Sequence, residues 1–158
     1  MKLILTAVGR ARDPALAAMF DDYVARLARG GKRGWRVELR EVEERRALPA
    51  AQAKARESEL LLARIPRGAR LVALDANGAQ LGSEAFAARL AIWRERGVGE
   101  IAFVIGGAEG LDAAILAKAD LVLSLGTMTW PHMLVRVMLV EQLYRAQSIL
   151  AGHPYHRR

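Results

Sequence analysis

The chain has 158 residues, of which 53% are hydrophobic and 6% aromatic, and its net charge is +7. This length predicts one domain over residues 1–158 with a buried core, and the excess of basic residues favours an acidic partner such as nucleic acid. The low aromatic content argues against an RNA recognition motif, and the absence of cysteine excludes disulfides and thiolate zinc sites.

Apolar strands alternate with helices along the chain. The opening apolar run is too short for a signal peptide, and no segment is long enough to span a membrane, so we expect a cytoplasmic protein. In chain order, the patterns predict strand 3–8, helix 14–29, a glycine turn at 30–34, strand 35–40, helix 49–65, strand 71–74, a turn at 77–78, helix 83–96, strand 101–105, helix 111–118, strand 121–125 and helix 131–150.

Two polar residues mark expected helix starts. Asp13 precedes Pro14 and is expected to cap the first helix, and Ser83 is expected to cap the helix that follows the turn at Asn77 and Gly78. Because strands and helices alternate, the predicted fold class is α/β, with a mostly parallel sheet and helices on both of its faces.

Three of the predicted strands end in segments suited to ligand binding. These ends are Leu74-Asp75, Ile105-Gly106-Gly107 and Leu125-Gly126, and ligands of open α/β sheets bind beyond the carboxyl ends of strands. Glycine lets the backbone approach a ligand closely or adopt a positive φ, and exposed amides and carbonyls would suit an adenosine-like molecule. The spacing G-G-x-x-G is not the dinucleotide fingerprint, which argues against a Rossmann oxidoreductase.

The last predicted helix carries an arginine, Arg136, within an apolar stripe. A buried arginine needs a partner, so Arg136 is either a structural ion pair or interface residue, or a functional residue at a pocket edge. Glu141, Gln142 and Arg145 gather on another side of the helix. The remaining faces are apolar enough to suggest burial on more than one side, as a homodimer through this helix would provide.

The tail contains two histidines, His153 and His156, on either side of Tyr155. Without cysteine or clustered carboxylates they make a poor metal site, so we expect no metal. A terminal segment is ordinarily disordered. This one instead combines residues that would order on RNA, stack on a base and titrate near neutral pH.

Several segments occur in a specific order and spacing. They are Met1-Lys2-Leu3 with Ala7-Val8-Gly9, Leu74-Asp75, Phe103 to Leu111, Leu123 to His132, Leu134-Val135-Arg136-Val137, Glu141 to Ala146, and His153-Pro154-Tyr155-His156. With these segments the chain resembles, end to end, the ribosomal large subunit methyltransferase H family. Those small bacterial SPOUT-class enzymes methylate N3 of a pseudouridine in 23S rRNA. Residues 10–70 are generic by comparison.

The resemblance implies a SPOUT-type fold, in which the C-terminal part of the sheet, roughly residues 101–150, is threaded into a trefoil knot, followed by a tail at 151–158. It also implies a homodimer that acts on 23S rRNA, preferably in the assembled ribosome, with S-adenosyl-L-methionine bound in the knot loops and each site completed by the partner's tail. The cofactor-binding residues carried over are Leu74, Gly106, Leu125, Gly126, Thr127, Met128, Thr129 and Trp130.

We assign catalytic roles to the tail and the last helix as hypotheses. His156, with His153 second, would handle the proton of the pseudouridine nitrogen, and Tyr155 would position or stack the base. Arg136 and Arg145 would contact phosphate or the developing negative charge.

The remaining basic residues leave a second function class open. Arg33, Arg36, Arg40, Arg45 and Arg46 match no family motif and form either a solvated face or an rRNA contact. A non-catalytic RNA-binding or ribosome-assembly protein would need such charge but not the glycine loops.

Overall fold

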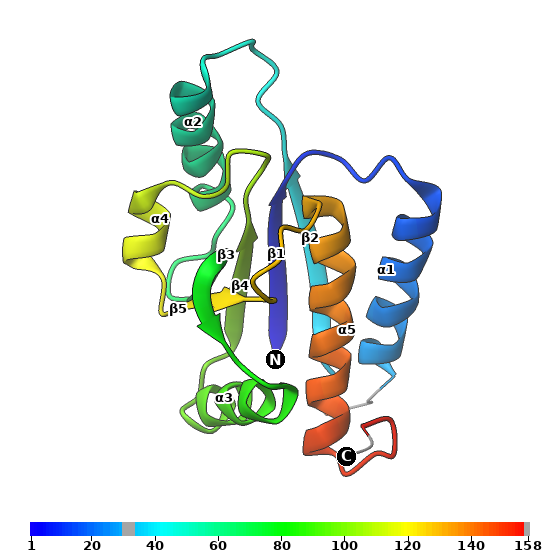
Figure 1. Cartoon of the computed structure of the whole chain (residues 1–158). Helices are drawn as coiled ribbons and strands as arrows, with labels where there is room; N and C mark the ends of the chain where they lie inside the picture. The colour runs from blue at the N-terminus through cyan, green and yellow to red at the C-terminus, as the bar shows by residue number, and fades with distance from the viewer. Residues whose placement is uncertain (30–33, 157–158) are drawn as a thin grey trace.

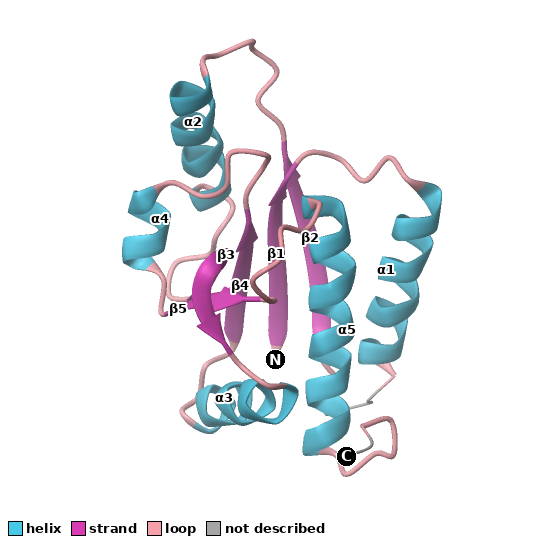
Figure 2. Cartoon of the chain, in the orientation of Figure 1, coloured by secondary structure: helices cyan, strands magenta, loops and turns pink. Residues whose placement is uncertain are grey.

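The computed structural model describes residues 1–29 and 34–156, so four residues of the predicted glycine turn lie outside the described residues. In chain order the elements are β1 (Lys2–Val8), α1 (Pro14–Ala28), β2 (Arg36–Val42), α2 (Ala50–Leu62), β3 (Arg70–Gln80), α3 (Ser83–Glu95), β4 (Glu100–Ile105), α4 (Ala113–Lys118), β5 (Leu121–Ser124) and α5 (His132–Leu150) (Figures 1 and 2). Within these residues, the strands form one parallel sheet in the order β2-β1-β4-β3-β5.

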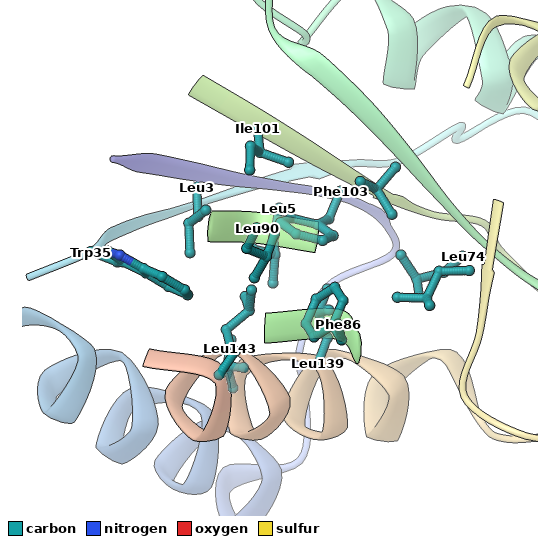
Figure 3. Close-up of a cluster of buried hydrophobic side chains, with 14 of the residues drawn as sticks. Leu3, Leu5, Trp35, Leu74, Phe86, Leu90, Ile101, Phe103, Leu139 and Leu143 are labelled. Carbon is teal, nitrogen blue, oxygen red and sulfur yellow. The ribbon is translucent and has the colours of Figure 1, made fainter. Parts of the chain in front are cut away.

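Helices cover both faces of the sheet, as the alternating pattern predicted. On one face Leu5 and Phe103 of the sheet join a core with side chains of α1, α3 and α5, among them Leu139 (Figure 3). On the other face Val104 packs in a second cluster that includes Leu61 of α2 and Ile115 of α4, with further side chains of the sheet. The predicted α/β class is therefore confirmed.

One of the two predicted helix caps is confirmed. Asp13 Oδ1 accepts hydrogen bonds from the backbone N–H groups of Ala15, at 2.8 Å, and Leu16, at 3.2 Å. The cap at Ser83 was wrong, because the N-cap of α3 is Gly82. The Ser83 hydroxyl instead donates to Gln142 Oε1 at 2.8 Å, which ties the start of α3 to α5.

The predicted turn at Asn77 and Gly78 was also wrong, because both residues lie inside β3. The register of β3 against β5 shifts between Leu74 and Ala79, so that both of these residues oppose Leu123. The glycine is required by close packing rather than by a turn. A Cβ at position 78 would lie 2.7 Å from the carbonyl carbon and oxygen of Val122.

No helix in the described part of the chain combines the length and apolar character needed to cross a membrane.

We expect Gly78→Ala to lower the free energy of unfolding by about 1–3 kcal/mol, because the added methyl group must push β5 away from β3. Gly99→Ala is the matched control, since no atom lies within 4 Å of the corresponding Cβ position. That substitution should change the free energy by less than about 1 kcal/mol. Urea unfolding at one protein concentration measures both values, and equal values would contradict the close packing described for Gly78.

Candidate active site

A cavity of about 250 Å³ lies where the middle of β3, at Leu74 to Asn77, and the carboxyl ends of β4 and β5 meet the start of α5. Its place agrees with the rule that ligands of open α/β sheets bind beyond the carboxyl ends of strands. The wall combines apolar side chains, backbone groups and a few polar side chains. The lining residues are Leu74, Asp75, Ala76, Asn77, Ile105, Gly106, Gly107, Ala108, Gly110, Leu123, Leu125, Gly126, Met128, Thr129, Trp130, His132 and Val135.

The glycine loop after β4 folds back on itself at the cavity. Gly107 and Gly110 form an isolated antiparallel bridge, in which the Gly110 N–H donates to the Gly107 carbonyl at 3.1 Å. A Cβ at Gly106 would lie 2.6 Å from the carbonyl of Gly110, and Gly110 has a φ of +74°. Gly106 therefore allows the close approach of two backbone segments, and Gly110 adopts the positive φ, which are the two roles predicted for glycine here.

The loop after β5 forms the opposite wall. The Ser124 hydroxyl donates to the Gly126 carbonyl at 2.9 Å and accepts from the Gly126 N–H at 3.2 Å, which fixes the first turn of the loop. At the rim, Met128 is 68% exposed and Trp130 is 37% exposed, so large apolar side chains face solvent beside the cavity. Exposed apolar groups around a hollow are typical of a binding site.

Seven of the eight predicted cofactor-binding residues line this one cavity. Thr127 lies in the same loop but does not line the cavity. The other seven are Leu74, Gly106, Leu125, Gly126, Met128, Thr129 and Trp130.

His132 is a polar lining residue to which sequence reasoning gave no role. A Cβ at Gly9 would lie 3.3 Å from His132 Nε2, so the imidazole packs against the end of β1. Burial, and then the positive charge of Arg136, lower the pKa of His132 below its ordinary value of 6.5. The sequence signal was its place after Trp130 and Pro131, at the start of the last helix.

The predicted catalytic tyrosine lies in a cluster on the second half of α5. The Tyr155 hydroxyl donates to Glu141 Oε1 at 3.1 Å and lies 3.3 Å from the hydroxyl of Tyr23. Its ring packs edge-on against Tyr144 and beneath the guanidinium of Arg145, with centroid distances of 4.7 and 4.9 Å. Burial, with these hydrogen bonds, raises the pKa of Tyr155. The tail is therefore held by side chains of α1 and α5.

The two tail histidines have different surroundings. His153 Nδ1 accepts the backbone N–H of Tyr155 at 3.2 Å. His156 Nε2 lies 3.6 Å from a carboxylate oxygen of Glu84, while its Nδ1 is buried and has no hydrogen-bond partner within the described part of the chain.

The single chain does not bring the two predicted sets of site residues together. The cavity lies at the first turn of α5, and the tail cluster packs against the second half of this helix, at Glu141, Tyr144 and Arg145. Glu141 and Arg145 follow the first residue of α5 by 9 and 13 positions, which corresponds to a rise of about 14–20 Å along the helix. Figure 1 shows the described residues that follow α5 at the end of the molecule opposite the start of this helix.

Arg136 is buried and does not line the cavity. Its side chain is 2% exposed, and Nη1 donates to Glu41 Oε1 at 2.6 Å. Nη2 donates to the carbonyls of Val8 and Gly9 at 2.7 and 2.8 Å. The ion pair considered from the sequence is thus present, and a contact of Arg136 with substrate stays a prediction.

Within residues 1–29 and 34–156, no group of three or more histidine or acidic side chains is placed to hold a metal ion.

The lowered pKa of His132 predicts how stability depends on pH. The folded chain disfavours the protonated imidazole, so the stability that His132 contributes is present above pH 6.5 and lost as the pH falls below it. NMR titration should give His132 a midpoint below 6.5, and the wild type should lose more stability than His132→Gln between about pH 7.5 and pH 5.5. A midpoint at or above the ordinary value would contradict the burial of this group.

Comparison with known proteins agrees with this geometry. A family model described as "Predicted SPOUT methyltransferase" matches residues 1–156. Three similar curated proteins are each named "Ribosomal RNA large subunit methyltransferase H" and align over 99% of both chains. They come from Rhodospirillum centenum, at 55% identity, Paramagnetospirillum magneticum, at 52%, and Paracoccus denitrificans, at 48%.

A solved structure of a probable methyltransferase from Bordetella pertussis Tohama I is similar in fold, with a TM-score of 0.54 at 17% identity. The alignment covers 92% of this chain and 95% of that chain. The family match spans nearly the whole chain and includes the glycine loop, the loop after β5 and the last helix that together enclose the cavity. The chain therefore belongs to the SPOUT methyltransferase family, as its motifs predicted.

Proposed function

We propose that this chain uses S-adenosyl-L-methionine to methylate N3 of a pseudouridine in 23S rRNA of the large ribosomal subunit. The observation that carries the proposal is the cavity formed by β3, the loops after β4 and β5, and the start of α5. Support for the rRNA substrate comes from the names of the full-length relatives, which state large-subunit ribosomal RNA. The net charge of +7 suits such a polyanion.

The cavity residues fit the proposed cofactor. Gly106 offers backbone at a position where any Cβ would collide with Gly110, and Leu74 and Leu125 offer apolar surface to an adenine ring. Around them, Gly126, Thr127, Met128, Thr129 and Trp130 would complete the cofactor loop. When bound, S-adenosyl-L-methionine supplies a methyl group activated by its positively charged sulfur. The chain then has to hold the acceptor nitrogen in line with that methyl group and manage one proton.

His156 is the proposed group for that proton. An imide nitrogen is a weak nucleophile until it loses its proton, so a base or a cation beside it would promote the transfer. Nδ1 of His156 is buried without a partner among the described residues, and Nε2 lies 3.6 Å from a carboxylate oxygen of Glu84, so the proposed role requires the tail to expose the ring to the substrate. His153 is the second candidate.

Tyr155 and the two arginines are proposed to support His156. The contacts of Tyr155 with Glu141 and Tyr23 suit a residue that positions the tail and the target base. Arg145 lies on the same cluster and is proposed to contact phosphate. Arg136 is proposed to stabilise negative charge at the cavity from the layer behind His132, since its guanidinium is held by Glu41 and the carbonyls of Val8 and Gly9.

We further propose that the chain acts as a homodimer and contains a trefoil knot within residues 101–150. The dimer is supported by the separation of cavity and tail along α5, because the tail of a second copy would then complete each cavity. The knot is proposed on the family match over residues 1–156. Both features would follow from membership of the family.

The proposed reaction predicts where a labelled methyl group appears. With methyl-labelled S-adenosyl-L-methionine and ribosomes lacking the modification, the label should be found in N3-methylpseudouridine after digestion of the 23S rRNA. Gly106→Val should abolish the labelling because its side chain would collide with the backbone of Gly110 and displace the glycine loop that lines the cavity, whereas Gly99→Val should retain it, since position 99 has open space.

Other results would contradict the proposal in distinguishable ways. Label in a different nucleoside would contradict the target. Absence of both labelling and cofactor binding in the wild type would indicate a non-catalytic RNA-binding protein.

A further inference from the structure

A second hollow lies on the side of the sheet where the strands have their carboxyl ends, between the ends of β1 and β2 and helix α2. Its volume is about 210 Å³, large enough for a phosphate group and its water, and it contains three arginines. The lining residues are Arg10, Glu41, Val42, Glu43, Arg45, Leu60 and Arg64. We propose that this arginine hollow binds a phosphodiester group of the RNA substrate, an inference that rests on the proposed function.

The charges of the arginine hollow favour an anion. Two guanidinium groups of the hollow lie near the carboxylate of Glu43, with N···O distances of 3.8 Å for Arg10 and 3.6 Å for Arg45, and Arg12 beside the hollow lies 3.7 Å from the same carboxylate. These distances exceed those of hydrogen bonds, and the side chains of Arg10, Arg45 and Arg12 are 60, 77 and 85% exposed. Their N–H groups therefore face solvent, ready for the bidentate contacts that arginine makes with phosphate.

The other carboxylate of the hollow, Glu41, is already neutralised. Its Oε1 accepts from the buried Arg136 at 2.6 Å and from the backbone N–H of Ala11 at 2.8 Å. Arg64 adds a further positive charge to the wall. The hollow thus keeps an excess of positive charge after both of its carboxylates are counted.

The loop that carries Arg10 and Arg12 is fixed in place beside the cavity. The Gly9 N–H donates to the carbonyl of Val42 at 2.8 Å, and the Gly9 carbonyl accepts from Arg136. Gly9 also packs against His132, which lines the cavity. A fixed site loses little conformational freedom on binding, and an RNA strand entering the cavity would extend past this loop.

Of the basic residues noted in the sequence, Arg45 lines the arginine hollow. Arg45 points to Glu43 at the hollow, whereas Arg46 is paired with Glu44 and Arg40 with Glu38 and the carbonyl of Arg64. Arg36 lines a different hollow at the opposite edge of the sheet, together with Arg94. Arg33 lies outside the described residues.

The test compares two double variants with equal loss of charge. Arg10→Gln with Arg45→Gln removes two guanidinium groups from the hollow. Arg94→Gln with Arg96→Gln removes two exposed arginines at the end of α3, at the opposite edge of the sheet. For each protein we would measure the affinity for unmodified ribosomes over a range of salt concentrations, and the affinity for S-adenosyl-L-methionine.

The hollow variant should bind ribosomes roughly tenfold more weakly, and the slope of log affinity against log salt should become shallower by about 0.7–0.9 for each phosphate that the variant no longer neutralises. Its affinity for S-adenosyl-L-methionine and the ribosome affinity of the control variant should match the wild type. If the ribosome affinity of the hollow variant is unchanged, or falls equally in both variants, the inference about the hollow is overturned. The proposed function would still stand in that case, provided that the wild type labels the rRNA. A wild type that neither binds nor labels ribosomes would overturn both.

Discussion

The arrangement of the whole molecule depends on one buried cation. Arg136, in the first half of α5, donates to the backbone carbonyls of Val8 and Gly9 at the end of β1 and to the carboxylate of Glu41 in β2. Its side chain is almost entirely buried. A buried guanidinium without its partners costs several kcal/mol, so helix and sheet are held at one fixed register. The apolar side chains of α5, such as Leu139 and Leu143, complete this attachment against the core (Figure 3). The first turn of the helix is thereby set over the strand ends, where it closes the cavity.

The attachment of α5 to the sheet also separates the proposed cofactor cavity from the proposed catalytic residues of the tail. With the start of α5 fixed at the cavity, the helix carries the backbone of the tail to the far end of the molecule (Figure 1), and the side chain of Tyr155 reaches back to Glu141 and Tyr23. The tail packs on α1 and α5 of its own chain and does not line the cavity of that chain. In the proposed homodimer, a second copy would supply the tail groups and so build a composite site for both cofactor and RNA.

Much of this arrangement could be predicted from the sequence. Alternating apolar runs predicted the parallel sheet and its two layers of helices, and the glycines after β4 and β5 predicted the cavity walls, because both signals are local. The path of β3 beyond Leu74 could not be predicted, since Asn77-Gly78 is an ordinary turn signal and only the tertiary crossing over Val122 explains the glycine. The role of His132 depends on the distant end of β1, and the pairing of Arg136 with Glu41 spans 95 residues. No spacing along the chain predicts contacts of that kind.

The central claim, that each active site combines the cavity of one copy with the tail of another, is tested most directly by mixing two inactive variants. Gly106→Val chains lack a usable cavity and His156→Ala chains lack the proposed base. After unfolding and refolding the two together, the account predicts that methyl transfer to unmodified ribosomes returns to about one quarter of the wild-type rate, because half of the dimers are mixed and each mixed dimer has one intact site. If the mixture stays as inactive as either variant alone, while mixed dimers are shown to form, cavity and tail act within one chain and the account is contradicted.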